Sequence, residues 1–343
     1  MGYKNKNYHK NLHRQAYDKL TNMLRAGEGR SKKEAIRTGT DRNKIFSYST
    51  YKTYWKHTKY FISYVKDHHP DCANLKHARD YVGEWLQTRV DKGLSAWTVH
   101  TEAKALSKLY GITPSDTDYF KPPERHREDI IRSRVESTSD KHFSKTNNAE
   151  LIKFCKCVGA RREGLTKLCG RDLITKEQIR QEVDRILDIS KERSLTKMEQ
   201  KDLMINKDAL LFTKNDYFVF LREKGGRERI SPICGSVADV QAVVERFRER
   251  EADEKVWRHV HSNADIHGYR ADYSNRIYRL YERDIEEIPY KLSKANRLYQ
   301  PDVYHCRRDE KYRCLDREAM RLASIALGHN RIDIVANNYL RGL

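Results

Sequence analysis

The sequence predicts a mainly helical protein with a small β component, built as two domains. Apolar residues recur at helical spacing through most of the 343 residues, a length that suits two domains. The segment YFVFLREKGGRERISPI, residues 217–233, instead alternates like two strands around a Gly225-Gly226 turn. Residues 113–145 hold three of the seven prolines and no sustained period. We therefore expect an interdomain linker at 113–145.

Residues 1–112 are expected to form an all-helical domain, because helical spacing repeats four times there. The predicted helices cover residues 9–26, 50–69, 75–93 and 95–111. In the second of them the aromatic and aliphatic side chains fall on one stripe, which indicates core packing. Lys52, Lys56 and Lys59 lie off that stripe and are candidates for contacts with DNA phosphates.

Residues 146–343 are expected to form a mixed α+β domain. A helix is predicted over 149–173, followed by a charged helical insertion at about 174–208. After the 217–233 hairpin, helices are expected at about 236–251 and 268–283. A second insertion, at about 284–314, runs into another short hairpin at 303–316, and the last helices extend from Asp316 to the end.

The charge balance predicts a polyanionic partner. Lys and Arg outnumber Asp and Glu by 68 to 49, which gives a net charge of +19. Nucleic acid is favoured over a membrane because the chain has no amphipathic anchor and no long apolar run. A basic protein that only needs solubility is the plainer alternative. Hydrophobic residues make up 38% of the chain, too many for a disordered one.

The cysteine pattern predicts reduced thiols in a cytoplasmic protein, and the expected nucleic-acid partner predicts association with the nucleoid. The seven cysteines form no CxxC pair and have no zinc-finger spacing. The first fifteen residues lack the apolar core of a signal peptide. No cofactor is expected, and no carboxylate cluster suggests a metal site.

The end of the chain carries the most specific chemical pattern. In LGHNRIDIVANNY, His329 is followed ten residues later by Tyr339. That separation lets a helix and its preceding loop bring both side chains to one cleft. A phenol can serve as a phosphate nucleophile when cations and a proton relay surround the phosphate. Such cations are therefore expected to come from upstream segments.

Three segments in order, GARREGLTKLCGRDL, EKGGRER and LGHNRIDIVANNY, resemble the motifs of the tyrosine recombinases, or phage-type integrases. The likeness covers essentially the whole chain and is greatest to integrases of mobile elements. It implies that Arg161 is the first arginine of the active site and Lys224 the hairpin lysine. It also implies that His329 is the second histidine and Tyr339 the nucleophile.

The family's H-x-x-R motif occurs twice in this chain. His267 and Arg270 are favoured because a helical pattern follows directly, as the family's fold requires. His305 and Arg308 are the alternative, because their distance from His329 matches the family spacing better. The carboxylate expected three positions after Arg161 is displaced, since position 164 is a glycine and Glu163 comes one residue early.

The resemblance implies site-specific recombination of double-stranded DNA, such as integration or excision of a mobile element. Tyr339 would attack a phosphate to give a 3′-phosphotyrosyl link, with Arg161 and Arg270 holding the phosphate oxygens. Lys224 would protonate the leaving oxygen, while His267 would accept the tyrosyl proton or orient the phosphate. His329 would hydrogen-bond a phosphate oxygen.

The expected assembly is a homotetramer on two DNA sites, one dimer per site, passing through a Holliday junction. An accessory directionality factor is a possible further partner, and Arg227 and Arg229 are predicted DNA contacts. Two alternatives remain open at this point. One is a type IB topoisomerase, which shares this chemistry, and the other is a non-catalytic DNA-binding protein on a recombinase fold.

Overall fold

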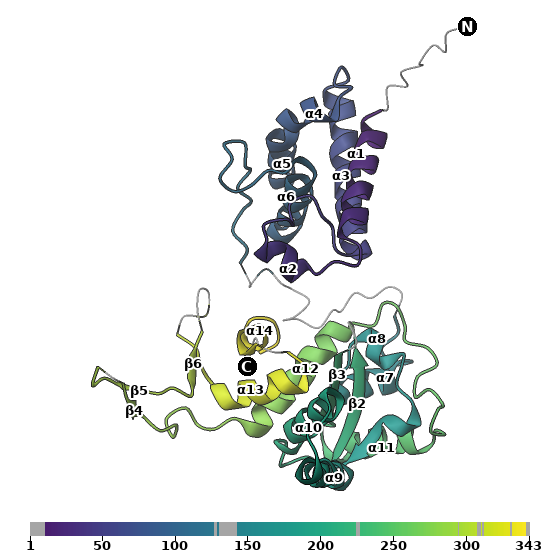
Figure 1. The fold of residues 1–343 in the computed structure, drawn as a ribbon, viewed down its shortest axis with the longest axis vertical. Helices are drawn as coiled ribbons and strands as arrows, with labels where there is room; N and C mark the ends of the chain where they lie inside the picture. The colour runs from purple at the N-terminus through teal and green to yellow at the C-terminus, as the bar shows by residue number, and fades with distance from the viewer. Residues whose placement is uncertain are drawn as a thin grey trace. The chain divides into compact units, whose positions relative to one another are not determined.

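The computed structural model describes residues 11–126, 129, 143–223, 227–293, 295–306, 310, 312–329 and 331–340. Helices account for 56% of the structure and strands for 9%, in small antiparallel sheets, which confirms the mainly helical class. The chain divides into two compact units, Met1–Asp129 and Ile130–Leu343 (Figure 1). Within the described ranges, none of the helices combines the length and apolar character that a membrane span requires.

The first unit is a bundle of helices around one core. Its elements are α1 (Leu12–Gly27), α2 (Lys32–Arg37), α3 (Tyr48–His68), α4 (Leu75–Ala78), η1 (Arg79–Tyr81), α5 (Val82–Asp91) and α6 (Ala96–Tyr110). Phe61 of α3 and Trp85 of α5 meet edge to face in the centre of this core. The single helix predicted over 75–93 is wrong, because a 3-10 turn separates α4 from α5. Helix α2 was not predicted; the Ser31 side chain caps it by accepting from the Glu34 backbone N–H.

Helix α3 has the two faces that its sequence predicts. Phe61, Ile62 and Val65 are buried, whereas the three lysines at positions 52, 56 and 59 are exposed. Each ammonium lies over an aromatic ring of the same helix, at 4.8 to 6.0 Å from the ring centroid. The lysines are therefore partly ordered on the helix surface before any partner binds.

The second unit surrounds a small sheet with helices. Its elements are α7 (Ala149–Val158), α8 (Arg162–Leu165), η4 (Gly170–Asp172), β1 (Leu173–Thr175), α9 (Lys176–Glu192), α10 (Lys197–Leu210), β2 (Tyr217–Glu223), β3 (Arg227–Pro232), α11 (Val237–Arg248), α12 (Ile266–Tyr281), β4 (Lys291–Leu292), β5 (Leu298–Tyr299), β6 (Val303–His305), β7 (Cys314–Asp316), α13 (Arg317–Ala326) and α14 (Ile332–Asn338). Both predicted hairpins are present. Strand β1 and the β4–β5 pair were not predicted, and they are only three and two residues long.

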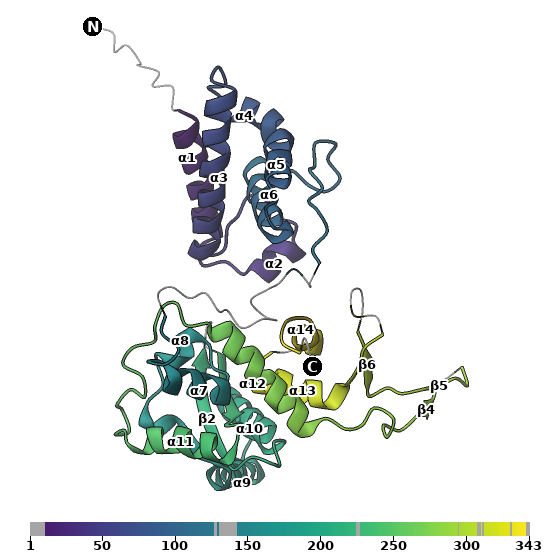
Figure 2. The same cartoon turned by 180° about the vertical axis from the view of Figure 1, so that it is seen from behind.

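The sheet has the order β1-β2-β3 and is antiparallel throughout. Alternate side chains of β2 face two different cores. Phe218 packs with residues of α12, α13 and α14, while Val219 and Leu221 pack with residues of α7 and α11. Figure 2 shows these helices on either side of the sheet. By the same alternation Glu223, at the end of β2, points toward the α7 side.

The helix predicted over 149–173 is broken at Gly159, and this break positions the next segment. Gly159 ends α7 with a left-handed φ of 60°, and a Cβ there would overlap the ring of Tyr273. Glycine is therefore required twice, for the backbone angle and for the close approach. Arg161 then has extended backbone angles as the residue before α8.

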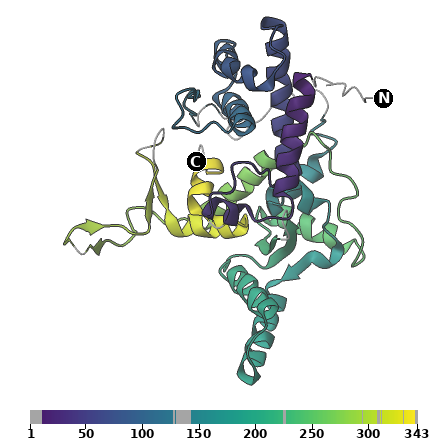
Figure 3. The same cartoon turned by 45° about the horizontal axis from the view of Figure 1, so that its top comes forward.

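The charged segment at about 174–208 forms a helical hairpin. Thr175 and Thr196 each open a helix with a capping box, and α9 and α10 pack side by side. Figure 3 shows these two teal helices projecting from the rest of the second unit. The predicted helical character of residues 174–208 is confirmed, with a break between the two helices.

Candidate active site

Three arginines surround one buried carboxylate in the second unit. The Glu223 side chain, 1% exposed, pairs with Arg161, with Arg229 (3.1 Å) and with Arg270 (3.6 Å). We call these four side chains the arginine cluster. They come from β2, from β3, from α12 and from the segment before α8, so the cluster joins parts of the chain that are far apart in sequence.

Arg270 is held rigidly in the interior. It lies on α12 and is 1% exposed, and its guanidinium donates to the backbone carbonyls of Gly159 and Leu327. Burial, and then the charge of Arg229, lowers the pKa of Arg270 to about 10, so the guanidinium stays charged near neutral pH. Because its carbonyl acceptors lie at the ends of α7 and α13, Arg270 ties α12 to both turns of the site.

Arg161 and Arg162 are adjacent in sequence but have different roles. Arg161 pairs with Glu223 at two points: its backbone N–H donates to Glu223 Oε1 (2.9 Å) and its guanidinium to Oε2. Arg162 instead donates to carbonyl oxygens along the loop before α12, those of Val260, His261, Ser262 and Ala264. The Arg161 side chain is 30% exposed and is the accessible member of the pair.

His329 and Tyr339 lie beside the cluster. Gly328 turns the chain after α13 with a φ of 66°, and His329 then donates its backbone N–H to the carbonyl of Ser324 (2.8 Å). Helix α14 carries the chain onward, so Tyr339 follows its last residue. His329 Nε2 lies 3.3 Å from Tyr339 Oη, and the Arg270 guanidinium carbon is 5.9 Å from the Tyr339 ring centroid.

The cluster sets the protonation states of its neighbours. Burial raises the pKa of the Glu223 carboxyl, but the charges of Arg229 and Arg270 outweigh it and lower the pKa to about 2. Burial, and then the charges of Arg270 and Arg161, lowers the pKa of His329 to about 4. At neutral pH the carboxyl is therefore ionised and the imidazole neutral, which leaves His329 able to accept one hydrogen bond and donate another.

The arginine cluster carries excess positive charge, and two of its hydrogen-bond donors have no partner among the described residues. Three guanidinium groups share one carboxylate, so the four side chains carry a net charge of +2. The Nε donors of Arg229 and Arg270 are buried and have no hydrogen-bond partner among the described residues. Buried donors and charges are normally paired. The arrangement therefore suits an anion with several acceptor oxygens.

The structure places the other predicted site residues as follows. His267 is exposed on the first turn of α12, three residues before Arg270. His305 lies on β6, where its Nδ1 is 3.3 Å from Cys314 Sγ, and it makes no contact with the cluster within the described part of the chain. Arg308 and Lys224 lie outside the described residues.

Arg229 was predicted to contact DNA, and the structure places its side chain in the interior. It is 6% exposed, and its guanidinium donates to Ser231 and to the carbonyl of Ala326 as well as pairing with Glu223. On β3 it lies opposite the buried Leu221 of β2, so its side chain is enclosed and belongs to the cluster. Arg227, two residues earlier, is exposed, as a DNA contact would have to be.

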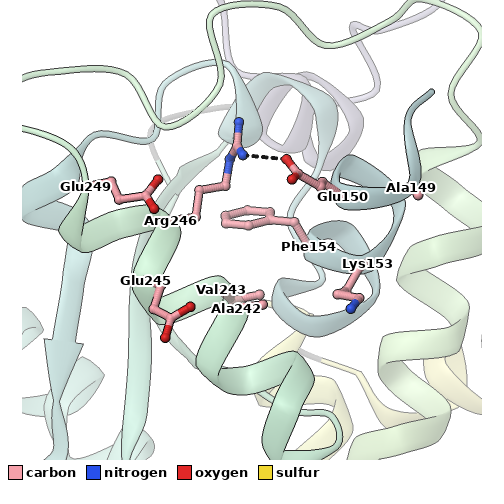
Figure 4. Close-up of a pocket in the computed structure, with 9 residues that line it drawn as sticks. All are labelled: Ala149, Glu150, Lys153, Phe154, Ala242, Val243, Glu245, Arg246 and Glu249. Carbon is pink, nitrogen blue, oxygen red and sulfur yellow. Dashed lines mark hydrogen bonds and ion pairs between the residues drawn. The ribbon is translucent and has the colours of Figure 1, made fainter. Parts of the chain in front are cut away.

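A groove and a pocket of the second unit are possible positions of the site. A groove of about 520 Å³ opens beside His329, and basic side chains of α10, β3 and α13 line it together with acidic ones. Figure 4 shows a separate pocket of about 330 Å³ between α7 and α11, where Arg246 donates to Glu150 (2.8 Å) over Phe154. Its nine drawn residues include no member of the cluster and neither His329 nor Tyr339, whereas Arg229 and His329 both line the groove. We therefore place the site beside the groove.

Glu223 and Ser231 contribute to this site although sequence reasoning did not select them. A signal for Glu223 was present, because the alternation of β2 puts position 223 on the same face as the buried Val219 and Leu221. A charge on a buried face needs partners. Among the described residues, no group of three His, Cys, Asp or Glu side chains could hold a metal ion.

Compared with known protein families and with curated proteins, the sequence matches no family model and no curated relative. The chemistry proposed for the site therefore rests on the residues and the geometry described above, together with the resemblance of the motifs.

Proposed function

We propose that this protein is a site-specific DNA recombinase that cleaves and rejoins duplex DNA through a covalent link to Tyr339. The observation that carries the proposal is the pairing of Tyr339 Oη with a neutral His329 beside a buried cluster of net positive charge. A phosphodiester supplies the missing anion, and a phenol held against it supplies a nucleophile. The charge of +19 and the order of the motifs support DNA as the source of that phosphate.

In the proposed reaction, Tyr339 Oη attacks the scissile phosphorus. A bond from Oη to phosphorus forms, the bond from phosphorus to the 5′-oxygen breaks, and the DNA keeps a 3′-phosphotyrosyl end. The tyrosyl proton leaves by His329 or by the exposed His267, and the 5′-oxygen is protonated as it leaves. By the resemblance, Lys224 supplies that proton. Religation reverses these steps with a 5′-hydroxyl from another strand.

The arginines supply the electrostatic part of the mechanism. A phosphodiester carries one negative charge, and a second develops in the pentacovalent transition state. The net charge of the cluster suits the transition state better than the ground state, which is the condition for catalysis. Arg161, the accessible arginine, and the rigid Arg270 are the groups we assign to the non-bridging oxygens.

A nicked suicide substrate tests the proposal. Duplex fragments from the flanks of the gene, nicked close to each candidate phosphate, release a short strand on cleavage and trap the protein on the DNA. We expect a denaturation-resistant protein–DNA complex with wild type and none with Tyr339→Phe, which keeps the ring but lacks the nucleophile. Tyr312→Phe is the matched control, because Tyr312 is fully exposed.

Further outcomes separate the alternatives. Joining of the trapped strand to a second site supports recombination, whereas relaxation of any supercoiled plasmid without a preferred site would indicate a type IB topoisomerase. Tight, specific binding with no covalent complex on the bound site would indicate a non-catalytic DNA-binding protein. Cross-linking on paired sites tests the tetramer that the resemblance implies.

A further inference from the structure

Position 164 is a glycine where the resemblance leads us to expect a carboxylate, three residues after Arg161. Gly164 is buried in α8, and its φ is not in the left-handed region, so its backbone would accept a side chain. A Cβ added there would lie 3.5 Å from Glu223 Cγ and 3.7 Å from its Oε1. The side chain of Glu223 therefore fills the space that a longer side chain at position 164 would enter.

We propose that Glu223 is the positioning carboxylate of the phosphate-binding arginines, supplied from β2 in place of a side chain at position 164. The inference rests on the proposed function, because it concerns the same site. Glu223 would not touch the substrate itself; it would act through the arginines that do.

The contacts of Glu223 suit this role. It accepts from both the backbone N–H and the guanidinium of Arg161, and so fixes that residue at two points. An arginine side chain that is 30% exposed would otherwise sample many rotamers. The same carboxylate lies 3.1 Å from Arg229 and 3.6 Å from Arg270, so it sets the spacing of all three guanidinium groups.

The negative charge of Glu223 has a second effect, on the binding of phosphate. Without it the cluster would carry three uncompensated positive charges, and a phosphate in the ground state would bind more tightly. Tighter ground-state binding does not speed the reaction, and loss of Arg161 orientation slows it. Replacing Glu223 by its neutral isostere should therefore strengthen phosphate binding and weaken cleavage at the same time. A purely structural residue would not separate these two quantities.

The test moves the carboxylate from β2 to α8. Glu223→Gln should lower the single-turnover rate of covalent complex formation at saturating DNA by about 100-fold. Gly164→Glu combined with Glu223→Ala places a carboxylate in the same space from the α8 side. We expect this double variant to recover about tenfold or more of the lost rate. Gly164→Glu alone should impair cleavage, because both carboxylates then compete for one space.

Glu182→Gln is the matched control. Glu182 lies on α9 and pairs with Arg185 of the same helix, outside both the cluster and the groove. This variant should cleave as wild type does. A folded Glu223→Gln protein that cleaves at the wild-type rate would overturn the proposal. So would a double variant that regains the wild-type melting temperature without regaining any cleavage.

A second readout does not depend on cleavage. Inorganic phosphate, titrated at constant ionic strength and followed by the melting temperature, should bind Glu223→Gln about tenfold or more tightly than wild type. The double variant should return to the wild-type affinity, and equal affinities in all three proteins would refute the role. If the three proteins differed in phosphate affinity as predicted but wild type never formed a covalent complex, the recombinase proposal would fail. Glu223 would then remain the residue that organises an anion-binding site. If Glu223→Gln did not fold without ligand, the double variant would still decide the question.

Discussion

His329 Nε2 lies 3.3 Å from the Tyr339 hydroxyl oxygen, although ten residues separate them in the chain. Gly328 makes this approach possible, because its left-handed turn ends α13 and directs His329 toward the end of α14. A Cβ at position 328 would lie only 2.7 Å from Arg229 Cδ, so the absence of a side chain there also leaves room for Arg229. One turn therefore places His329 beside Tyr339 and leaves room for Arg229.

The lowered pKa of His329 predicts a specific pH dependence of stability. Its pKa is about 4 in the folded protein and 6.5 in the reference state. Between these values the unfolded chain binds a proton that the folded chain does not, so the free energy of unfolding should fall as the pH drops from 6.5 toward 4. Above pH 4.5 Glu223 does not contribute to this change in the free energy of unfolding, because its pKa in the folded protein is lowered to about 2.

Urea unfolding at pH 7 and pH 5 measures this effect. In His329→Gln the difference between the two pH values should shrink relative to wild type. Met198→Gln is the control, because that side chain is exposed and carries no titratable group, so the difference should be unchanged. An undiminished difference in His329→Gln would show that the imidazole is not held neutral.

The adjacent arginines predict opposite phenotypes. Arg161→Ala should reduce covalent complex formation by about 100- to 1,000-fold, as expected for loss of a donor to the transition state, with a small loss of stability. Arg162→Ala should lower the free energy of unfolding by about 2–4 kcal/mol, because it leaves loop carbonyls without their charged donor. Single-turnover cleavage and urea unfolding of both variants test the contrast, and a reversed pattern would exchange their roles.

A single methyl group added at Gly159 is expected to lower the stability of the second unit strongly. Gly159→Ala should destabilise the second unit by about 2–5 kcal/mol, from the left-handed φ and from overlap with Tyr273. Gly111→Ala is the matched control in the first unit. Its φ of 71° is similar but nothing lies within 4 Å of an added Cβ, so only the backbone cost of about 1 kcal/mol applies. Similar costs for the two variants would mean that the contact with Tyr273 is relaxed easily.

The exposed lysines of α3 predict a change in the salt dependence of DNA binding. Replacing Lys52, Lys56 and Lys59 together with alanine should reduce the slope of log K against log salt by roughly 0.9 for each phosphate that the protein no longer neutralises. The control replaces three exposed basic residues of α9 that are paired with acids of the same helix, Arg180, Arg185 and Lys191. It removes the same charge, and an equal change in its slope would argue against a specific role for α3.

Features fixed by local spacing could be predicted from the sequence. The stripe of α3, the strands of the 217–233 hairpin and the helix that follows Arg270 all follow from periodicity, and each is present. The approach of His329 to Tyr339 depended on a separation along one helix and its preceding loop, which is also a local property.

Features fixed by tertiary contacts could not be predicted. Arg229 looked like a DNA contact because it is a basic residue near a hairpin turn, and only the pairing of β3 with β2 turns it inward. The carboxylate of the cluster was sought near Arg161 in sequence, whereas the fold supplies it from a strand 62 residues away. The break at Gly159 depends on Tyr273, which belongs to another helix.

The most direct test of the account is to identify the residue that bears the DNA. The complex trapped on a suicide substrate is digested with nuclease and protease, and the peptide that carries the nucleotide is sequenced by mass spectrometry. We predict a nucleoside 3′-phosphate attached to the hydroxyl of Tyr339. Attachment to another residue, or specific binding to the DNA site with no attached nucleotide, would contradict the proposed mechanism.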